Sequence, residues 1–108
     1  MKQVQAMNLI RGRWHESASG KRFESYNPAD TREVIGTAPC SNASDVDAAV
    51  RAAREAYPMW RAMSRVKRGE LIDNLAQLIK RDLNALSELV TRECGKPINE
   101  GRADVVEA

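Results

Sequence analysis

The side chains of this chain that could act as nucleophiles, acid–base groups or metal ligands include two cysteines, Cys40 and Cys94, and a single histidine, His15. Cys40 follows Pro39 in a predicted loop, so an exposed and oxidisable thiol is expected there, with no histidine nearby in sequence and no metal-ligand spacing around it. Cys94 falls on the apolar side of a predicted helix end, where a cysteine usually packs as a small hydrophobe rather than acting as a nucleophile. His15 is expected to face solvent from a strand.

The sequence gives little support for a site that binds phosphate or nucleic acid. The six glycines are scattered and form no Gly-x-Gly-x-x-Gly loop, so no phosphate cradle is predicted. A cluster of basic residues beside Trp60 could bind phosphate or nucleic acid. Its members are Arg61, Arg65, Lys67 and Arg68. Because the net charge is only +2 and the charges are interleaved, a hydrated helix surface is the favoured interpretation, and no nucleic-acid partner is expected.

Residues 8–37 are expected to form short strands and hairpins. Leu9 and Ile10 precede the turn signal at Gly12 and Trp14 follows it, which predicts a strand, a tight turn and a return strand. Residues 21–26 alternate like a strand with one covered face. The tetrad Asn-Pro-Ala-Asp at 27–30 predicts a turn, and a strand resumes over 33–37. Residues 1–7 are expected to form a loose leader.

Helices are expected over residues 45–57, 65–80, 83–94 and 98–108. Ser44 is expected to cap the first helix, with Asp47 reaching back as in a capping box, and Pro58 to end it.

The later helix boundaries follow from caps and breakers. Asp82 is expected to cap the third helix after a break near residues 80–81. Gly95 is placed to close that helix in a left-handed conformation, and Pro97 suits the first turn of the next.

Apolar residues recur at spacings of three and four along the second and third helices, a pattern typical of a core-facing stripe. Its members are Ile72, Leu75, Ile79, Leu83, Leu86, Val90 and Cys94. A surface for a partner helix is the alternative interpretation.

Four blocks of this sequence resemble, in the same order, segments near the N-terminus of NAD(P)-dependent aldehyde dehydrogenases. They are NLIRGRW at 8–14, YNPAD at 26–30 with EVIG at 33–36, residues 45–60, and ECGKP at 93–97. The resemblance covers roughly residues 8–108. Within the family, KRGE at 67–70, TRE at 91–93 and RADV at 102–105 look closest to semialdehyde dehydrogenases such as the α-ketoglutarate semialdehyde type.

The resemblance implies an α/β fold, with residues 8–108 as the N-terminal portion of a coenzyme-binding domain. The implied parent oxidises an aldehyde to a carboxylate with NAD or NADP through a cysteine thiohemiacetal. In the family the nucleophilic cysteine, the general-base glutamate and the coenzyme loop lie further along. No catalytic or cofactor-binding residue is therefore expected in these 108 residues, and the piece alone is expected to be inactive.

The resemblance also implies roles for two groups of residues, a cation site and part of a substrate tunnel. Many members bind Na⁺ or K⁺ through backbone oxygens before Asn-Pro and a carboxylate before Gly-Lys, which correspond here to Ser25, Tyr26 and Glu93. Hard monovalent cations prefer such oxygen ligands. Glu93 as an ordinary surface carboxylate is the alternative. Asp104 and Ala108, four apart on one helix face, correspond to positions bordering the substrate tunnel, or else face solvent or neighbouring helices.

Length and composition bound the remaining possibilities. A chain of 108 residues suits one domain. Two cysteines are too few for a disulfide scaffold and no stretch of 18 apolar residues occurs, so a cytoplasmic protein without a membrane partner is expected. The expected partners are a small-molecule aldehyde and, for the parent enzyme, further copies in a dimer or tetramer. The rival hypothesis is a non-catalytic helical interaction module.

Overall fold

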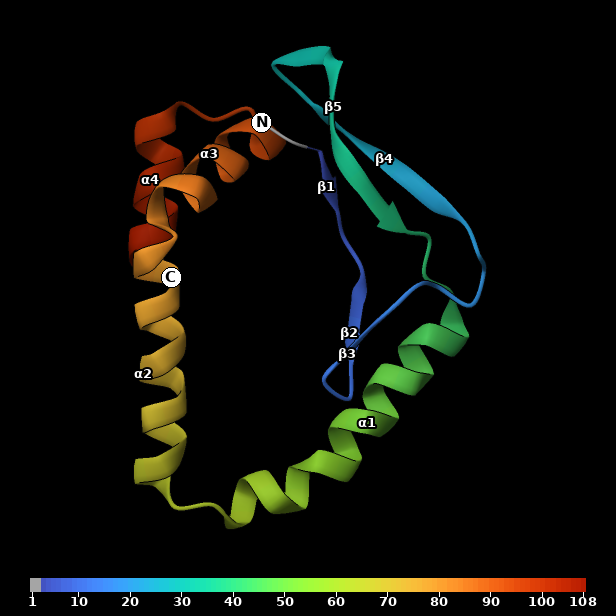
Figure 1. The fold of residues 1–108 in the computed structure, drawn as a ribbon, viewed down its shortest axis with the longest axis vertical. Helices are drawn as coiled ribbons and strands as arrows, with labels where there is room; N and C mark the ends of the chain where they lie inside the picture. Colours follow the sequence, from blue (N-terminus) through green and yellow to red (C-terminus); the bar gives the residue numbers. More distant parts are fainter. Residues whose placement is uncertain (1–2) are drawn as a thin grey trace. The chain divides into compact units, whose positions relative to one another are not determined.

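The computed structural model describes residues 3–108 and shows strands followed by helices, as the sequence predicts (Figure 1). The strands are β1 (Val4–Gln5), β2 (Asn8–Ile10), β3 (Arg13–His15), β4 (Arg22–Asn27) and β5 (Asp30–Pro39). The helices are α1 (Ala43–Ala62), α2 (Arg65–Arg81), α3 (Leu83–Cys94) and α4 (Ile98–Glu107). None of these helices is long and apolar enough to cross a membrane, within the described range. The chain divides into two compact units, residues 1–25 with 34–62 and residues 26–33 with 63–108.

The β1 strand was not expected, because residues 1–7 were predicted to be a loose leader. Val4 and Gln5 instead pair in parallel with Gly36 and Thr37 of β5, in a sheet of order β1–β5–β4. The close approach depends on Gly36, since a Cβ there would lie 2.1 Å from the Val4 carbonyl oxygen. Residues 1–2 of the predicted leader lie outside the described residues.

The predicted hairpin at residues 8–15 is confirmed. β2 and β3 pair antiparallel, with Leu9 opposite Trp14. The two residues between them, Arg11 and Gly12, have φ angles of 54° and 72°. Two successive left-handed residues are the conformation that matches the twist of a two-residue hairpin. His15 is exposed at the end of β3, as expected.

The first helix begins two residues earlier than predicted, and its cap is Asn42 rather than Ser44. The Asn42 Oδ1 accepts hydrogen bonds from the amides of Ser44 (3.0 Å) and Asp45 (3.3 Å). The Asp45 carboxylate in turn accepts from the Asn42 amide at 2.9 Å, which completes a capping box. The prediction placed the box at Ser44 and Asp47 because serine and asparagine are near-equal caps.

The Asp45 carboxylate also anchors the loop after β3. It accepts hydrogen bonds from the Ser17 hydroxyl (2.6 Å) and the Ala18 amide (2.9 Å). These bonds, with that from the Asn42 amide, hold the pKa of Asp45 below its ordinary value, the Ser17 bond being the largest cause. Ser17 is buried in this loop.

Pro58 does not end α1, contrary to the prediction. The helix continues to Ala62 with the proline inside it. A proline lacks one amide donor and so removes a single hydrogen bond to the preceding turn. The residues after Pro58 retain their own amides, and the helix continues until Met63 and Ser64.

The helices of the second unit match the predicted boundaries closely. Ser64 caps α2, its hydroxyl accepting from the Lys67 amide at 3.2 Å. The predicted break is found at Asp82, but this carboxylate pairs with Arg81 and caps no amide. Gly95 ends α3 in the left-handed conformation, with φ 70°, as predicted. Pro97 occupies the position immediately before α4 rather than its first turn.

The α3–α4 pair is the tightest helix contact of this unit. Ser87 is the most buried side chain of the described residues, and Gly101 and Val105 of α4 are buried with it. A Cβ on Gly101 would lie 2.7 Å from the Thr91 Oγ1 and 2.9 Å from the Ser87 carbonyl oxygen. Glycine therefore sets the distance between the two helices.

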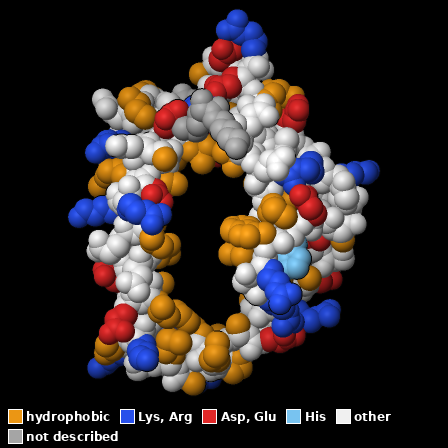
Figure 2. Space-filling model, viewed as in Figure 1, with side chains coloured by type: hydrophobic (Ala, Val, Ile, Leu, Met, Phe, Trp, Pro, Cys, Tyr) orange, Lys and Arg blue, Asp and Glu red, His pale blue; other side chains and the backbone are white. Residues whose placement is uncertain are grey.

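The predicted apolar stripe is only partly a core face. Its α3 residues Leu83, Leu86 and Val90 are half-buried, whereas Ile72 and Leu75 of α2 are 58% and 52% exposed. Hydrophobic side chains accordingly reach the surface along the helices (Figure 2). Within residues 3–108, the α2 part of the stripe is therefore covered only at Ile79, which is half-buried.

Candidate functional site

The hairpin turn between β4 and β5 forms one wall of the candidate site. The Asn27 Oδ1 accepts a hydrogen bond from the Ala29 amide at 2.9 Å, a local bond that asparagine makes readily before a turn. The Asn27 Nδ2 donates to the Glu33 Oε2 at 2.7 Å. One asparagine side chain thus braces the turn and joins its two strands.

Helix α3 meets this turn through an ion pair. Arg92 donates from Nε and Nη2 to the Glu33 Oε1, at 2.8 and 2.5 Å. The Arg92 side chain is only 12% exposed and that of Glu33 is 36% exposed. The Asn27 hydrogen bond first, and the Arg92 guanidinium second, hold the pKa of Glu33 below its ordinary value. We call Asn27, Glu33 and Arg92 the clamp.

Gly95 brings the end of α3 against the same turn. Its amide donates to the Thr91 carbonyl at 2.9 Å and closes the helix. A Cβ on Gly95 would lie 2.9 Å from the Pro28 Cγ and 3.7 Å from the Ala29 amide nitrogen. The backbone at the end of α3 therefore packs directly on the proline of the turn.

The residues predicted to bind a cation flank the clamp. Tyr26 precedes Asn27, and Glu93 follows Arg92 on the exposed last turn of α3. Ser25 is a half-buried residue of β4, the outer strand of its sheet. Backbone carbonyl oxygens and an exposed carboxylate are ligands of the kind that suits Na⁺ or K⁺, and along an outer strand every second carbonyl points away from the sheet. No group of three histidine, cysteine or acidic side chains that would suit a transition metal occurs among residues 3–108.

A second polar contact lies between α3 and α4. Lys96 donates to the Asp104 carboxylate at 2.5 Å, and this hydrogen bond is the main reason that the pKa of Lys96 is raised. Arg102 donates to the Asn84 side-chain oxygen at 2.8 Å. The first contact joins the α3–α4 connection to α4, and the second joins the start of α3 to the middle of α4.

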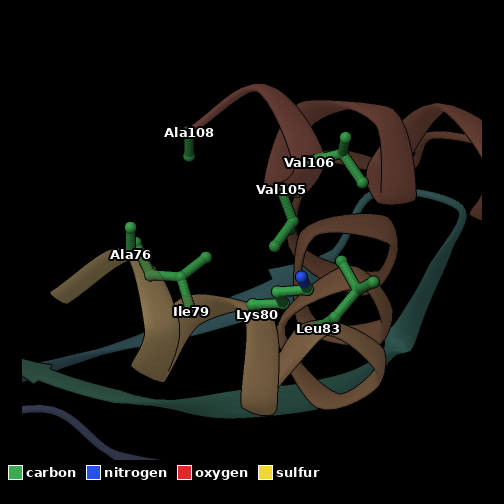
Figure 3. Close-up of a pocket in the computed structure, with 7 residues that line it drawn as sticks. All are labelled: Ala76, Ile79, Lys80, Leu83, Val105, Val106 and Ala108. Carbon is green, nitrogen blue, oxygen red and sulfur yellow. The ribbon is translucent and has the colours of Figure 1, made fainter. Parts of the chain in front are cut away.

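An apolar pocket of about 350 Å³ opens beside these helices (Figure 3). Its walls come from the end of α2, the start of α3 and the last residues of the chain, namely Ala76, Ile79, Lys80, Leu83, Val105, Val106 and Ala108. Ile79 and Val105 point toward one another across it (Figure 3). Of the two predicted tunnel residues, Ala108 lines the pocket, whereas Asp104 bonds to Lys96.

Residues 14–108 match the Aldehyde dehydrogenase family. The chain belongs to the aldehyde dehydrogenase family. The resemblance inferred from four sequence blocks is thereby confirmed.

Individual relatives agree with this assignment. The chain is 35% identical over 98 residues to alpha-ketoglutaric semialdehyde dehydrogenase of Bacillus subtilis, covering 91% of this chain and 20% of that protein. It is 48% identical over 91 residues to cytosolic aldehyde dehydrogenase 1 of Elephantulus edwardii, covering 82% and 18%. The crystal structure of NAD-dependent aldehyde dehydrogenase from Sinorhizobium meliloti matches with a TM-score of 0.93 and 33% identity, over 97% and 21% of the two chains. The chain thus spans about a fifth of the length of these relatives.

The two cysteines of this aldehyde dehydrogenase chain are both free and exposed. Exposure of Cys40 was predicted, but Cys94 was expected to pack in the core. That expectation is wrong because the last turn of α3 is open to solvent, with Glu93, Cys94 and Gly95 all exposed. The spacing of apolar residues predicts which face of α3 is buried. It does not predict at which residue of that face burial by neighbouring elements stops.

Sequence reasoning did not identify the clamp. Glu33 and Arg92 lie 59 positions apart, so no local spacing connects them. Both residues belong to blocks that resemble the family, at 33–36 and 91–93, and their opposite charges are the available signal.

Proposed function

We propose that this chain works as the N-terminal part of a longer, NAD(P)-dependent aldehyde dehydrogenase. The observation that carries the proposal is the family match over residues 14–108, together with relatives about five times longer. In the proposed reaction a cysteine thiolate adds to the aldehyde carbon, hydride leaves the resulting thiohemiacetal for NAD⁺ or NADP⁺, and water hydrolyses the thioester to the carboxylate. The cysteine and general-base glutamate for these steps belong to sequence outside the 108 residues.

The proposed substrate is a small aldehyde, with a semialdehyde favoured. Support comes from the relative in Bacillus subtilis, whose name specifies α-ketoglutaric semialdehyde. A carboxylate-bearing substrate would need cationic side chains free to bind it, and the cations near the turn are already paired, Arg32 with Asp30, Lys96 with Asp104 and Arg92 with Glu33. The choice among semialdehydes therefore falls to the rest of the polypeptide.

This chain contributes structural chemistry to the proposed enzyme. We expect the backbone oxygens of Ser25 and Tyr26 and the Glu93 carboxylate to hold Na⁺ or K⁺, with further oxygens supplied from elsewhere. We expect Asp104 and Ala108 to border the substrate tunnel, a role for which the apolar pocket beside Ala108 offers support. The parent enzyme is proposed to be a cytoplasmic dimer or tetramer.

A non-catalytic interaction module is the second candidate function. The observation that favours it is the exposed stripe of α2, where Ile72 and Leu75 lie more than half exposed. Contiguous apolar surface of this kind marks a face that another protein segment covers. In the enzyme hypothesis the cover comes from the same polypeptide, and in the module hypothesis from a different one.

Sequencing the natural reading frame on both sides of these 108 residues and assaying its product separates the two functions. We expect a longer protein that reduces NAD⁺ or NADP⁺ when semialdehydes or simple aldehydes are added. A natural product that stops at Ala108 and reduces neither coenzyme would instead establish the module.

A further inference from the structure

The clamp forms a continuous polar chain from helix to turn. Arg92 donates to one oxygen of Glu33, Asn27 donates to the other, and the Asn27 oxygen holds the Ala29 amide. Bonds to a charged group in a partly buried setting are among the stronger hydrogen bonds of a protein. Together with the contact between Gly95 and Pro28, they determine where the end of α3 lies against the hairpin turn.

Two clamp residues are direct sequence neighbours of residues predicted to bind the cation. Asn27 directly follows Tyr26, and Arg92 directly precedes Glu93. Adjacent Cα atoms are about 3.8 Å apart, so fixing one residue restricts its neighbour. The clamp therefore controls the separation between the Tyr26 backbone oxygen and the last turn that carries Glu93.

The clamp also governs the charge beside Glu93. A guanidinium one residue from a cation ligand would repel the cation or take the carboxylate as its own partner. Glu33 accepts both an Nε and an Nη2 bond from Arg92, which directs the guanidinium to the hairpin.

We infer that Asn27, Glu33 and Arg92 are positioning residues that set the affinity of the monovalent-cation site at Tyr26 and Glu93. The inference rests on the cation site of the proposed function. Partners that orient ligands from behind usually change metal affinity about 10–100-fold when they are mutated. Breaking the clamp should weaken Na⁺ or K⁺ binding by about tenfold or more.

The test is a cation titration of thermal stability in the complete enzyme. Tm is measured against KCl or NaCl at constant ionic strength, with tetramethylammonium chloride as the balancing salt. A ligand that binds only the folded state raises Tm as it saturates, so the curve yields an affinity. Arg92→Gln and Glu33→Gln are compared with Arg102→Gln, which removes the Asn84 contact elsewhere on the helix pair.

The inference expects the wild type and Arg102→Gln to share one cation midpoint, and both clamp variants to need about tenfold more cation. Arg92→Lys, which keeps the charge but not the two-nitrogen contact, should fall between them. A merely structural clamp would lower Tm equally in every salt and leave the midpoint unchanged, which would overturn the inference. A wild type without any cation response would overturn it as well.

Aldehyde oxidation is measured on the same preparations to separate the two hypotheses. An active wild type whose stability ignores Na⁺ and K⁺ refutes the positioning role and leaves the proposed dehydrogenase intact. A cation response that depends on the clamp in a protein without dehydrogenase activity supports the positioning role and refutes the proposed function. If Arg92→Gln does not fold, Glu33→Gln alone gives the result, because it keeps the size of the side chain.

Discussion

The same substitution, glycine to alanine, should have opposite effects at two helical positions of this chain. Gly69 lies in α2, where an added Cβ meets none of the described residues within 4 Å. Gly101 lies in α4, where it would approach the Thr91 Oγ1 to 2.7 Å and the Ser87 carbonyl oxygen to 2.9 Å. Both positions gain the same helix propensity from alanine, so their difference reports the contact between α3 and α4.

The magnitudes follow from that comparison. Alanine in place of glycine favours a helix by about 0.8–1 kcal/mol, so Gly69→Ala should stabilise by about that amount. Overpacking a tight contact costs about 1–3 kcal/mol, so Gly101→Ala should be neutral to destabilising by about 2 kcal/mol. The two variants should then differ by about 1–3 kcal/mol.

Urea unfolding of the complete enzyme, followed by circular dichroism, measures this difference. The Gly69→Ala midpoint should lie above the Gly101→Ala midpoint, by the free-energy difference divided by the enzyme's own denaturant slope. Adding Thr91→Ala to Gly101→Ala removes the nearer contact and a buried hydroxyl that has no hydrogen-bond partner among residues 3–108, so part of the loss should return. Equal stabilisation by both glycine substitutions would refute the close helix contact.

Four further outcomes are expected. Asn42→Ala should destabilise α1 by about 1 kcal/mol, because it removes the cap; an unchanged unfolding midpoint would contradict the observed bonds. The pKa of Asp45 is lowered in the folded state, so its stabilisation should be present above about pH 4 and lost as pH falls further; Asp45→Asn should remove that part of the acid sensitivity in a pH titration of helicity. In the complete enzyme, Ala108→Trp should raise KM for bulky aldehydes and spare small ones, and unchanged kinetics across a graded series would exclude a tunnel role. The isolated 108 residues should show no coenzyme binding by calorimetry and should associate in the ultracentrifuge, whereas micromolar NAD⁺ binding or a compact, cooperatively melting monomer would contradict these expectations.

Local signals in the sequence predicted most of the elements. The hairpin at Arg11 and Gly12, the break at Asp82 and the left-handed Gly95 each depend on a few adjacent residues, and all are confirmed. The errors at Ser44 and Pro58 are also local, since they concern competing caps and a helix that tolerates one missing donor.

Long-range structure was harder to predict. β1 pairs with β5 across more than 30 positions, through a glycine whose importance shows only when Val4 lies beside it. The clamp likewise joins Glu33 to Arg92 across 59 positions. Periodicity indicates which face of a helix is apolar, but not whether another segment covers it, which explains both the exposed α2 stripe and the exposed Cys94.

The central claim is that these residues serve an aldehyde-oxidising enzyme, and the natural protein tests it most directly. The protein is isolated from its source with an antibody against this chain, its mass is determined, and coenzyme reduction is followed with an aldehyde panel. We expect a polypeptide several times larger than 12.0 kDa that forms NADH or NADPH only when aldehyde is present. A natural protein of 12.0 kDa that binds another protein and reduces no coenzyme would contradict it.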